Sequence, residues 1–394
     1  MLDTNKIKFK CKKKNNKDKV DKYLYEDFDF FMWPYEEQTK IKHKVLQEYL
    51  YVWATKLGSS NNINYYDGFS GCGAYYDSQE KELCLGSPII AKIQFLTAKR
   101  DFKSHYFLND KNEENIENIK KVFNYKKINT QNIIYSVGDF ERNIDEFLTR
   151  LEKNPKPTFF MIDPFGINAS YKTISRIMKI PKTEVFFNFM YNFTRRFSNN
   201  EKSENNITSL FGTQKWKIYK EECDDSKEIH LKDLYREQLK KCAKYVYQYR
   251  MCFSNEKRTY YYLFHASNNR DGCSIMKDSF AKINNGNVEF LGPDQPNPDQ
   301  LALIDLTKDK IENLRNEIWQ EFRGKTVLFK DVVDKYLDLT VYLERHIKQA
   351  ILQMKEEYAT FDHVNPKTRT INYDDSIIFF NEPQYIPKQT SFDF

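Results

Sequence analysis

Asp67-Gly68-Phe69-Ser70-Gly71-Cys72-Gly73 is the stretch of sequence that decides the fold. It directly follows a short apolar run at residues 63–66. Glycines in such a turn let the backbone approach a ligand closely, and an acidic residue at a strand end can anchor a polar group of that ligand. The pattern predicts a turn after a strand. This turn either binds a ligand or is a tight turn without one.

The spacing of the glycines narrows the class of ligand. Position 76 is Tyr76, so the G-x-G-x-x-G spacing of a dinucleotide site is absent. The form D-x-F-x-G-x-G is associated with S-adenosylmethionine sites, in which the turn faces the methionine end of the cofactor. We therefore expect a cofactor site that includes Asp67, Phe69, Gly71 and Gly73.

Four further apolar runs follow, at residues 104–108, 133–137, 158–162 and 184–189. Each ends near a polar residue or glycine, and most are separated by helical stretches. Buried strands that alternate with helices predict a parallel α/β sheet. Ligands of such sheets bind outside the carboxyl ends of the strands.

Acidic residues stand at two of these strand ends. Asp110 closes the run 104–108, where a carboxylate can accept from two ribose hydroxyls, and Asn109 is an alternative one position earlier. Asp139 follows the next run and can accept from the adenine amino group, with Phe140 available to stack on the ring. Each of these acids is equally open to interpretation as a helix N-cap.

Asp163-Pro164-Phe165-Gly166 ends another strand and carries the candidate catalytic residues. Amino-methyltransferases place a D/N/S-P-P-Y/F tetrad at this point, where the Asp and a carbonyl accept from the target amine and the aromatic ring holds a flat base. Here Phe165 stands in place of the second Pro, and Gly166 in place of the aromatic residue. The alternative is a strand-end turn without a substrate.

The net charge of +6 is confined to the N-terminus. Residues 1–22 contain nine Lys and three Asp, so the remaining chain is neutral. We expect residues 1–24 to form a basic, flexible arm that either contacts nucleic acid or is only solvated.

Several classes of protein are excluded or disfavoured by composition. No apolar run reaches the length of about 18 residues that a membrane span requires. The charged stretch 6–14 stands where a signal peptide would lie, and no apolar segment follows it, so we expect a cytoplasmic protein. The seven Cys include no C-x-x-C pair, and no two His are four residues apart, so we expect no metal site.

The C-terminal region, 299–394, follows a Pro-rich linker at 292–298 and predicts a winged-helix-like module. Residues 322–394 carry ten basic and eleven acidic residues, a balance that favours a partner or self-association surface over DNA reading. The main domain would then span 25–298. We also expect helices at 37–57, 113–123, 227–246, 274–283, 309–322, 329–336 and 341–357, a loop at 199–206, a strand at 258–266 and a β wing at 368–373.

Two groups of polar residues suggest contacts with a polyanion. Lys40 and Lys42, with Lys44, flank the entry to the sheet, and Asn192, Arg195 and Arg196 follow the fifth strand. Arg side chains beside a catalytic site can hold phosphate. A surface Arg pair without a ligand is the alternative.

Taken together, these residues resemble the three-Cys-motif partner proteins, which are bacterial and methyltransferase-like. The similarity covers about residues 37–357 and includes Lys40, Lys42, 66–73, Gly86-Ser87-Pro88, 163–166, Asn188-Phe189-Met190, Arg195-Arg196-Phe197 and 272–283 with Met276-Lys277-Asp278. Cys72 and Asn109-Asp110 depart from the family pattern, in which a small residue or Pro and a Glu are expected. The resemblance implies a Rossmann-like methyltransferase fold with a C-terminal helical module, and a radical-SAM-type protein with three cysteines as a partner.

Two functions follow as expectations. The first is methyl transfer from S-adenosylmethionine to a nucleic-acid amine, which depends on proximity and alignment and needs no catalytic His. The second is a non-catalytic protein of the same fold that binds the three-Cys protein or nucleic acid, in phage defence, with self-association of the C-terminal module as a further expectation.

Overall fold

The computed structural model describes residues 1–11, 21–58, 62–98, 102–198, 200–252, 258–283, 306–361 and 371–384. The chain divides into two compact units, Met1–Asp294 and Gln295–Phe394. The domain boundary that we predicted after residue 298 lies outside the described residues.

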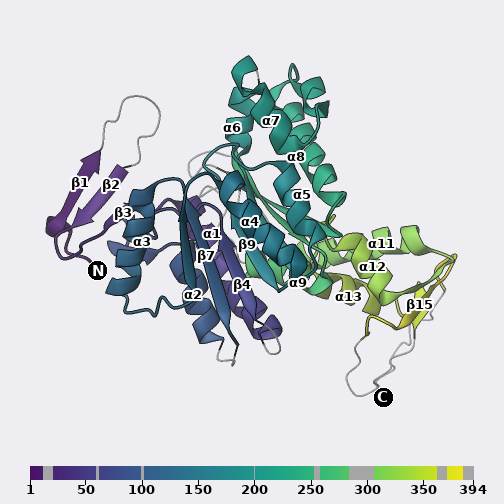
Figure 1. Ribbon diagram of the computed structural model, residues 1–394. Coiled ribbons are helices and arrows are strands. Elements are labelled where there is room, and N and C mark those ends of the chain that lie inside the picture. The colour runs from purple at the N-terminus through teal and green to yellow at the C-terminus, as the bar shows by residue number, and fades with distance from the viewer. Residues whose placement is uncertain are drawn as a thin grey trace. The chain divides into compact units, whose positions relative to one another are not determined.

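A seven-stranded sheet forms the centre of the first unit (Figure 1). Its strands are β4 (Ile63–Asp67), β7 (Ser104–Asp110), β8 (Ile133–Val137), β9 (Thr158–Ile162), β10 (Thr183–Phe189), β11 (Tyr245–Cys252) and β12 (Thr259–Ser267). Their order is β8-β7-β4-β9-β10-β12-β11, and only β12 runs antiparallel to its neighbours. Numbered along the chain, the six strands of common direction have the Rossmann order 3-2-1-4-5-6, with β12 inserted between the last two.

Helices cover both faces of this sheet, as its two-sided burial requires. The helices of the unit are α1 (Glu37–Leu57), α2 (Ser87–Thr97), α3 (Glu113–Tyr125), α4 (Phe140–Lys153), α5 (Tyr171–Lys179), α6 (Tyr191–Phe197), α7 (Glu204–Phe211), α8 (Asp224–Lys240) and α9 (Arg270–Ile283), with short 3₁₀ turns at Thr4–Lys6, Glu201–Ser203 and Lys215–Tyr219. The helices α1, α2 and α9 pack together on one face, whereas α4, α5, α7 and α8 share a core with the other. Every side chain of β4, β9 and β10 is buried, so these three strands form the centre of the unit.

A second, five-stranded sheet in the order β1-β2-β3-β5-β6 lies beside the glycine turn. Its strands are β1 (Ile7–Cys11), β2 (Asp21–Tyr25), β3 (Phe31–Pro34), β5 (Ala74–Asp77) and β6 (Glu82–Leu85). The first two strands pair antiparallel over five residues each, where we had expected a flexible arm.

The positive charge of this N-terminal hairpin is partly balanced by acids that follow it in sequence. Lys6 pairs with Asp27 at 3.0 Å and Lys8 with Glu26 at 2.8 Å. Tyr23 also packs on Tyr76 of β5, with ring centroids 4.9 Å apart. A charge count that ends at residue 22 stops just before these acidic partners, which is why it suggested a free basic arm.

Several other element predictions were wrong at their boundaries. Part of the predicted loop 199–206 belongs to α7, and the predicted helix 227–246 ends at Lys240 because the chain enters β11 five residues later. The strands β3, β5 and β6 were not predicted. They are four residues long each, too short to show a clear alternation of apolar and polar residues.

The described part of the second unit, residues 306–361 and 371–384, combines three helices with a small antiparallel sheet of order β13-β15-β14. Its elements are α11 (Leu306–Phe322), β13 (Thr326–Leu328), α12 (Phe329–Tyr336), α13 (Glu344–Leu352), β14 (Ala359–Phe361) and β15 (Ser376–Phe379). The predicted helix 341–357 is therefore shorter, and the third strand begins after the predicted wing at 368–373, part of which lies outside the described residues. A winged-helix function for this helical unit stays a prediction.

Within the described residues, no helix is both long enough and apolar enough to cross a membrane.

Candidate functional site

The order of the sheet reverses at β4, whose neighbours are β7 on one side and β9 on the other. Ligands of open α/β sheets bind at such a reversal, outside the carboxyl ends of the strands. Asp67 ends β4, and Asp163 directly follows β9. The structure thus brings the glycine motif and the Asp163 motif, 96 positions apart in sequence, to one edge of the sheet.

Asp67 is fully buried and accepts three hydrogen bonds from inside the protein. Its Oδ2 accepts from the Tyr65 hydroxyl at 2.9 Å and the Ser87 hydroxyl at 2.7 Å, and its Oδ1 accepts from the Phe69 amide at 3.3 Å. Burial raises the pKa of this carboxyl to about 7, against the lowering effect of those donors. Asp67 therefore stabilises the glycine turn through hydrogen bonds within the protein. We had expected it to contact the ligand directly.

The glycine turn is tightly enclosed by side chains. Gly71 and Gly73 have φ values of +61° and +77°, which residues with a side chain adopt at a cost. A Cβ atom on Gly71 would meet the Trp33 ring at 3.0 Å, and one on Gly73 would meet Ile119 and Ile89 at 2.9 Å. The turn thus needs both glycines, and Trp33 of β3 covers it.

Replacing Gly73 with Ala should destabilise the first unit by about 2–4 kcal/mol, because a left-handed backbone cost and overpacking add together. Gly166→Ala is the matched control. Its φ is +123°, but the nearest atoms to an added Cβ lie 3.9 Å away, so only the backbone cost remains. Urea unfolding of both variants measures the difference, and equal effects would show that Gly73 is not confined by its neighbours.

Asn118 of α3 fixes β3 against the glycine turn, a role that sequence reasoning missed. Its side chain exchanges two hydrogen bonds of 2.8 Å with the backbone of Phe31 and donates a third to the Cys72 carbonyl at 2.7 Å. The position of Trp33, two residues after Phe31, is therefore set before any ligand binds. An Asn on a polar helix gives no signal of such a contact in the sequence.

The end of β7 supplies two polar side chains with different roles. Asn109 is buried and links the turns around it, since it donates to the Gly68 carbonyl at 3.0 Å and accepts from Asn143 at 2.7 Å. Asp110 is partly exposed, and it accepts from the Gly71 amide at 2.9 Å. Burial raises the pKa of Asp110. Asn109 and Asp110 were the two candidates for binding the ribose hydroxyls. Asp110 is the one that presents a carboxylate at the edge of the site.

Asp139 and Phe140 begin α4 next to this position. Asp139 is exposed and caps the helix by accepting from the Arg142 amide at 3.2 Å. Phe140 is only 2% exposed, and its ring packs on Phe69 with centroids 5.0 Å apart. The adenine-stacking role that we predicted for Phe140 does not fit this burial, because the ring belongs to the core beneath the turn.

Asp163 has two partners inside the site. Lys42 of α1 forms an ion pair with its Oδ2, and the Asn188 amide donates to its Oδ1 at 2.6 Å. The Asn188 side chain is buried, and its carbonyl oxygen has no hydrogen-bond partner among the described residues. From sequence, Asn188 was named only as part of the family resemblance and had no predicted role in the site, although a polar residue inside an apolar strand is a signal for one.

The rest of the Asp163 motif forms a turn that exposes Phe165. Pro164 and Gly166 are buried, and the Gly166 amide donates to the Pro164 carbonyl at 3.0 Å. Phe165, two residues after Asp163 in the chain, is 68% exposed. A ring at this position can contact a flat ligand without moving any core residue.

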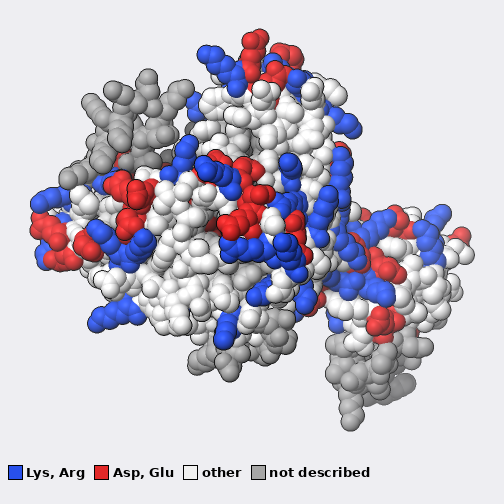
Figure 2. All heavy atoms as spheres, viewed as in Figure 1, with Lys and Arg blue, Asp and Glu red and all other residues white. Residues whose placement is uncertain are grey.

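The predicted phosphate-binding residues are mostly engaged with acids. Lys40 pairs with Asp77 at 2.7 Å, and Arg195 pairs with Asp224. Asn192 is buried, whereas Arg196 is exposed and has no ion pair with the described residues. Of the two predicted basic groups, Lys44 and Arg196 are the exposed cations that have no ion pair with the described residues. On the face shown in Figure 2, basic and acidic side chains are interspersed.

The surroundings of His43 on α1 make this residue unsuited to act as a general base. It is buried next to Lys42, and burial lowers its pKa to about 3. Its Nδ1 lies 3.2 Å from the Tyr35 hydroxyl. The imidazole is therefore neutral at ordinary pH and belongs to the aromatic packing around β3.

The residues present fit the adenosine half of S-adenosylmethionine. A carboxylate offers about four acceptor positions. The carboxylate of Asp139 accepts one hydrogen bond from within the protein. The carboxylate of Asp110 accepts three, and this residue is still partly exposed. Both stand at adjacent strand ends, where ribose hydroxyls and an adenine amine would find acceptors. Trp33 covers Gly71, so the amino-acid half of such a ligand would meet its indole.

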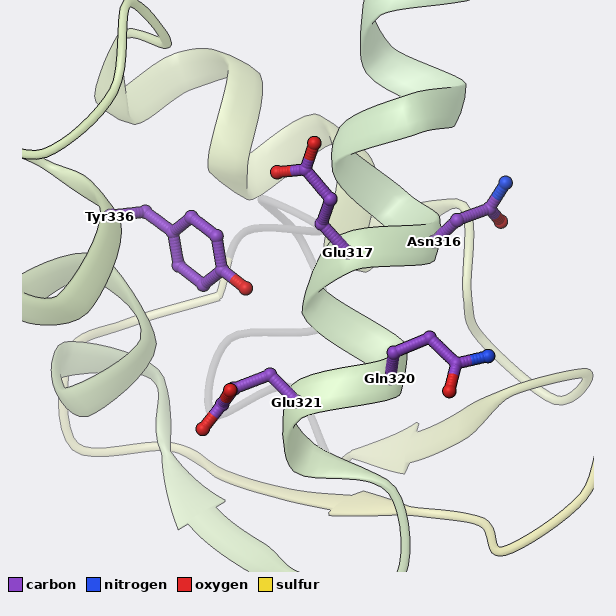
Figure 3. A pocket seen from close by; sticks show the side chains of 5 residues that line it. All are labelled: Asn316, Glu317, Gln320, Glu321 and Tyr336. Carbon is purple, nitrogen blue, oxygen red and sulfur yellow. The ribbon is translucent and has the colours of Figure 1, made fainter.

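Two hollows lie away from these strand ends. One, of about 540 Å³, is bounded by α1, the β5–β6 hairpin and α2 and includes Lys40, His43 and Cys84. The other, of about 550 Å³, belongs to the second unit, where Glu317, Glu321 and Tyr336 face one another (Figure 3). Burial raises the pKa of Tyr336 to about 12. Across the described residues, no cluster of His, Cys, Asp and Glu could hold a metal ion.

No protein-family model matches the sequence, and no curated protein does either. Solved structures are similar to the chain. Protein LPL1258 of Legionella pneumophila is 12% identical over 64% of this chain and 94% of its own, with a TM-score of 0.36. The O-methyltransferase of Bacillus cereus, solved with SAH, is 11% identical over 57% and 80%, with a TM-score of 0.33. A putative rRNA methylase of Clostridium thermocellum is 12% identical over 59% and 98%, with a TM-score of 0.31.

These overall similarities are low, so the fold assignment depends on the strand order and on the site at its reversal. The parallel strands follow the Rossmann order, and the glycine turn and strand-end acids occupy the edge where that fold binds ligands. The first unit therefore has the Rossmann-like α/β fold that S-adenosylmethionine methyltransferases share.

Proposed function

We propose that this protein is an S-adenosylmethionine-dependent methyltransferase whose acceptor is the exocyclic amine of a nucleic-acid base. The observation that carries the proposal is the hydrogen-bonded pair Asp163 and Asn188 at the ends of adjacent strands. Phe165, two residues after Asp163 in the chain, adds an exposed aromatic ring. An amine presents two N–H donors, and the carboxylate of Asp163 and the unpartnered carbonyl oxygen of Asn188 are two acceptors for them.

The chemistry assigns separate roles to these residues. When bound, S-adenosylmethionine supplies an electrophilic methyl group. Asp163 and Asn188 accept from the amine and turn its lone pair outward, and Phe165 holds the plane of the base. Asp163 is also placed to take the proton that the nitrogen loses. Alignment of this kind supplies most of the rate enhancement for such a transfer.

Binding of S-adenosylmethionine tests the cofactor part of this proposal. Isothermal titration calorimetry should give a micromolar dissociation constant for the wild type, and Asp110→Ala should weaken binding at least tenfold because the ribose hydroxyls lose a charged acceptor. Asn112→Ala is the matched control, since Asn112 caps α3 at the same edge without a carboxylate. Absence of binding by the wild type would contradict the proposal.

A second function is favoured by one observation, the ion pair between Lys42 and Asp163. The Lys42 ammonium occupies an acceptor position that a substrate amine would need. In this alternative the protein is a non-catalytic member of the methyltransferase fold, as its resemblance to the three-Cys-motif partner proteins suggests, and it binds a radical-SAM-type protein. Co-purification of the two proteins without any binding of S-adenosylmethionine would support it.

A further inference from the structure

Three phenylalanine rings form a row that leads away from the Asp163 motif. Phe165 contacts Phe193 edge to face with ring centroids 5.5 Å apart, and Phe193 stacks on Phe197 at 5.9 Å. Phe193 and Phe197 are four residues apart on α6, so they lie on one side of that helix. We call Phe165, Phe193 and Phe197 the phenylalanine row.

The outer end of the row faces solvent. Phe165 is 68% exposed, whereas Phe197 packs against the core of the unit and anchors the row from below. The backbone enforces this exposure, because the left-handed Gly166 closes a turn that projects Phe165 outward. Single exposed apolar residues are common, but this ring is supported by Phe193 and follows Asp163 by two residues in the chain, which favours a binding feature.

Arg196 places one cation next to the phenylalanine row. Arg196 neighbours Phe197 on α6, is exposed and has no ion pair with the described residues. Arg195 is held by Asp224, and Lys42 is held by Asp163. A ligand of the row therefore gains more from ring contacts than from neutralised phosphates, and the expected dependence on salt is shallow.

We propose that the phenylalanine row is a stacking platform for single-stranded nucleic acid, on which the target base, held by Phe165, and the bases next to it lie while Arg196 contacts a phosphate. This inference deepens the proposed function, on which it rests, by naming the form of the substrate. Bases in a duplex present only their edges, so a ring can stack on them only in single strands or after extrusion. Stacking on an aromatic side chain contributes about 1–3 kcal/mol per base.

Fluorescence anisotropy with a labelled 15-nucleotide strand tests the platform. The full-length protein, without S-adenosylmethionine, should bind single-stranded DNA or RNA more tightly than the duplex of the same sequence. Phe165→Ala should weaken binding about tenfold, as one lost stacking contact implies. Phe165→Leu should be as weak as Phe165→Ala if ring stacking matters, and close to wild type if the side chain is only apolar.

The controls separate stacking from general effects. Ile218→Ala removes a side chain that is 73% exposed on another element of the same unit, and it should leave binding unchanged. Arg196→Ala should reduce the salt slope by about one phosphate contact. Separate DNA and RNA strands show which nucleic acid is preferred.

The outcomes are distinct from those of the cofactor test. Equal binding by wild type and Phe165→Ala, or preference for the duplex, would overturn the platform even if S-adenosylmethionine binds. Conversely, single-strand binding that depends on Phe165, together with no binding of the cofactor, would retain the platform and remove the methyltransferase proposal. Binding of none of these strands by a folded wild type would also overturn the platform.

Discussion

Asp163→Ala should lower the free energy of unfolding by about 3 kcal/mol, because it leaves the buried ammonium of Lys42 without its partner. The Lys42 side chain is only 7% exposed and that of Asp163 is 23% exposed. Removal of one partner from a buried pair costs about 3–5 kcal/mol, and the partial exposure of Asp163 places this pair at the lower end. Urea unfolding measures the loss.

A double variant shows whether the loss comes from the pair itself. Lys42→Met with Asp163→Ala removes both charges, keeps an apolar stem near the Tyr261 ring, and should recover more than half of the lost stability. The pair Lys56 and Asp271, about half exposed on both sides, is the matched control, and Asp271→Ala should cost less than about 1 kcal/mol. A coupling between Lys42 and Asp163 as small as that control would refute the buried-pair description.

The same pair explains a limit of sequence reasoning. Lys40 and Lys42 stand close together on α1 with Lys44, so they appeared as one basic group for a polyanion. In the structure, Lys42 turns into the site and Lys40 turns to Asp77 of the β5–β6 hairpin. The acids that engage them lie 37 and 121 positions away, a distance that no local pattern reveals.

The sequence was sufficient to predict the edge of the sheet at which the site lies. The runs 63–66, 104–108, 133–137, 158–162 and 184–189 correspond to β4, β7, β8, β9 and β10, and each acid or glycine that follows them lies at a strand end. Apolar runs bounded by polar residues are local signals, and the Rossmann order follows from few topological rules. The fold class and the common edge were therefore accessible without a structure.

The side chains that enclose the site could not be predicted from local sequence patterns. Trp33 reaches Gly71 from a four-residue strand in a second sheet, and Asn118 holds that strand from a helix. Phe140 was expected to face a ligand, yet it fills the space against Gly68, where an added Cβ would lie 2.7 Å from its ring. Whether a side chain at a strand end faces ligand or core depends on packing from distant segments.

Asp67 should make the stability of the first unit fall as the pH rises from about 4 to about 7. Its pKa is about 7 in the folded protein, above the value of about 3.9 in an unfolded chain, so the folded state binds this proton more tightly. Below pH 4 the carboxyl is protonated in both states. Above pH 7 it is ionised in both, and the folded state retains the full cost of a buried charge, roughly 2–4 kcal/mol.

Asp67→Asn removes this titration while it preserves the shape and most hydrogen bonds of the side chain. The variant should match wild type near pH 4.5 and exceed its stability by pH 7.5, as followed by urea unfolding with tryptophan fluorescence. Ser87→Ala provides the complementary change. It removes a donor that lowers the pKa of Asp67, so the decline with pH should extend to higher pH. If wild type and Asp67→Asn show parallel pH profiles, Asp67 titrates normally and the turn is held by contacts other than this buried carboxyl.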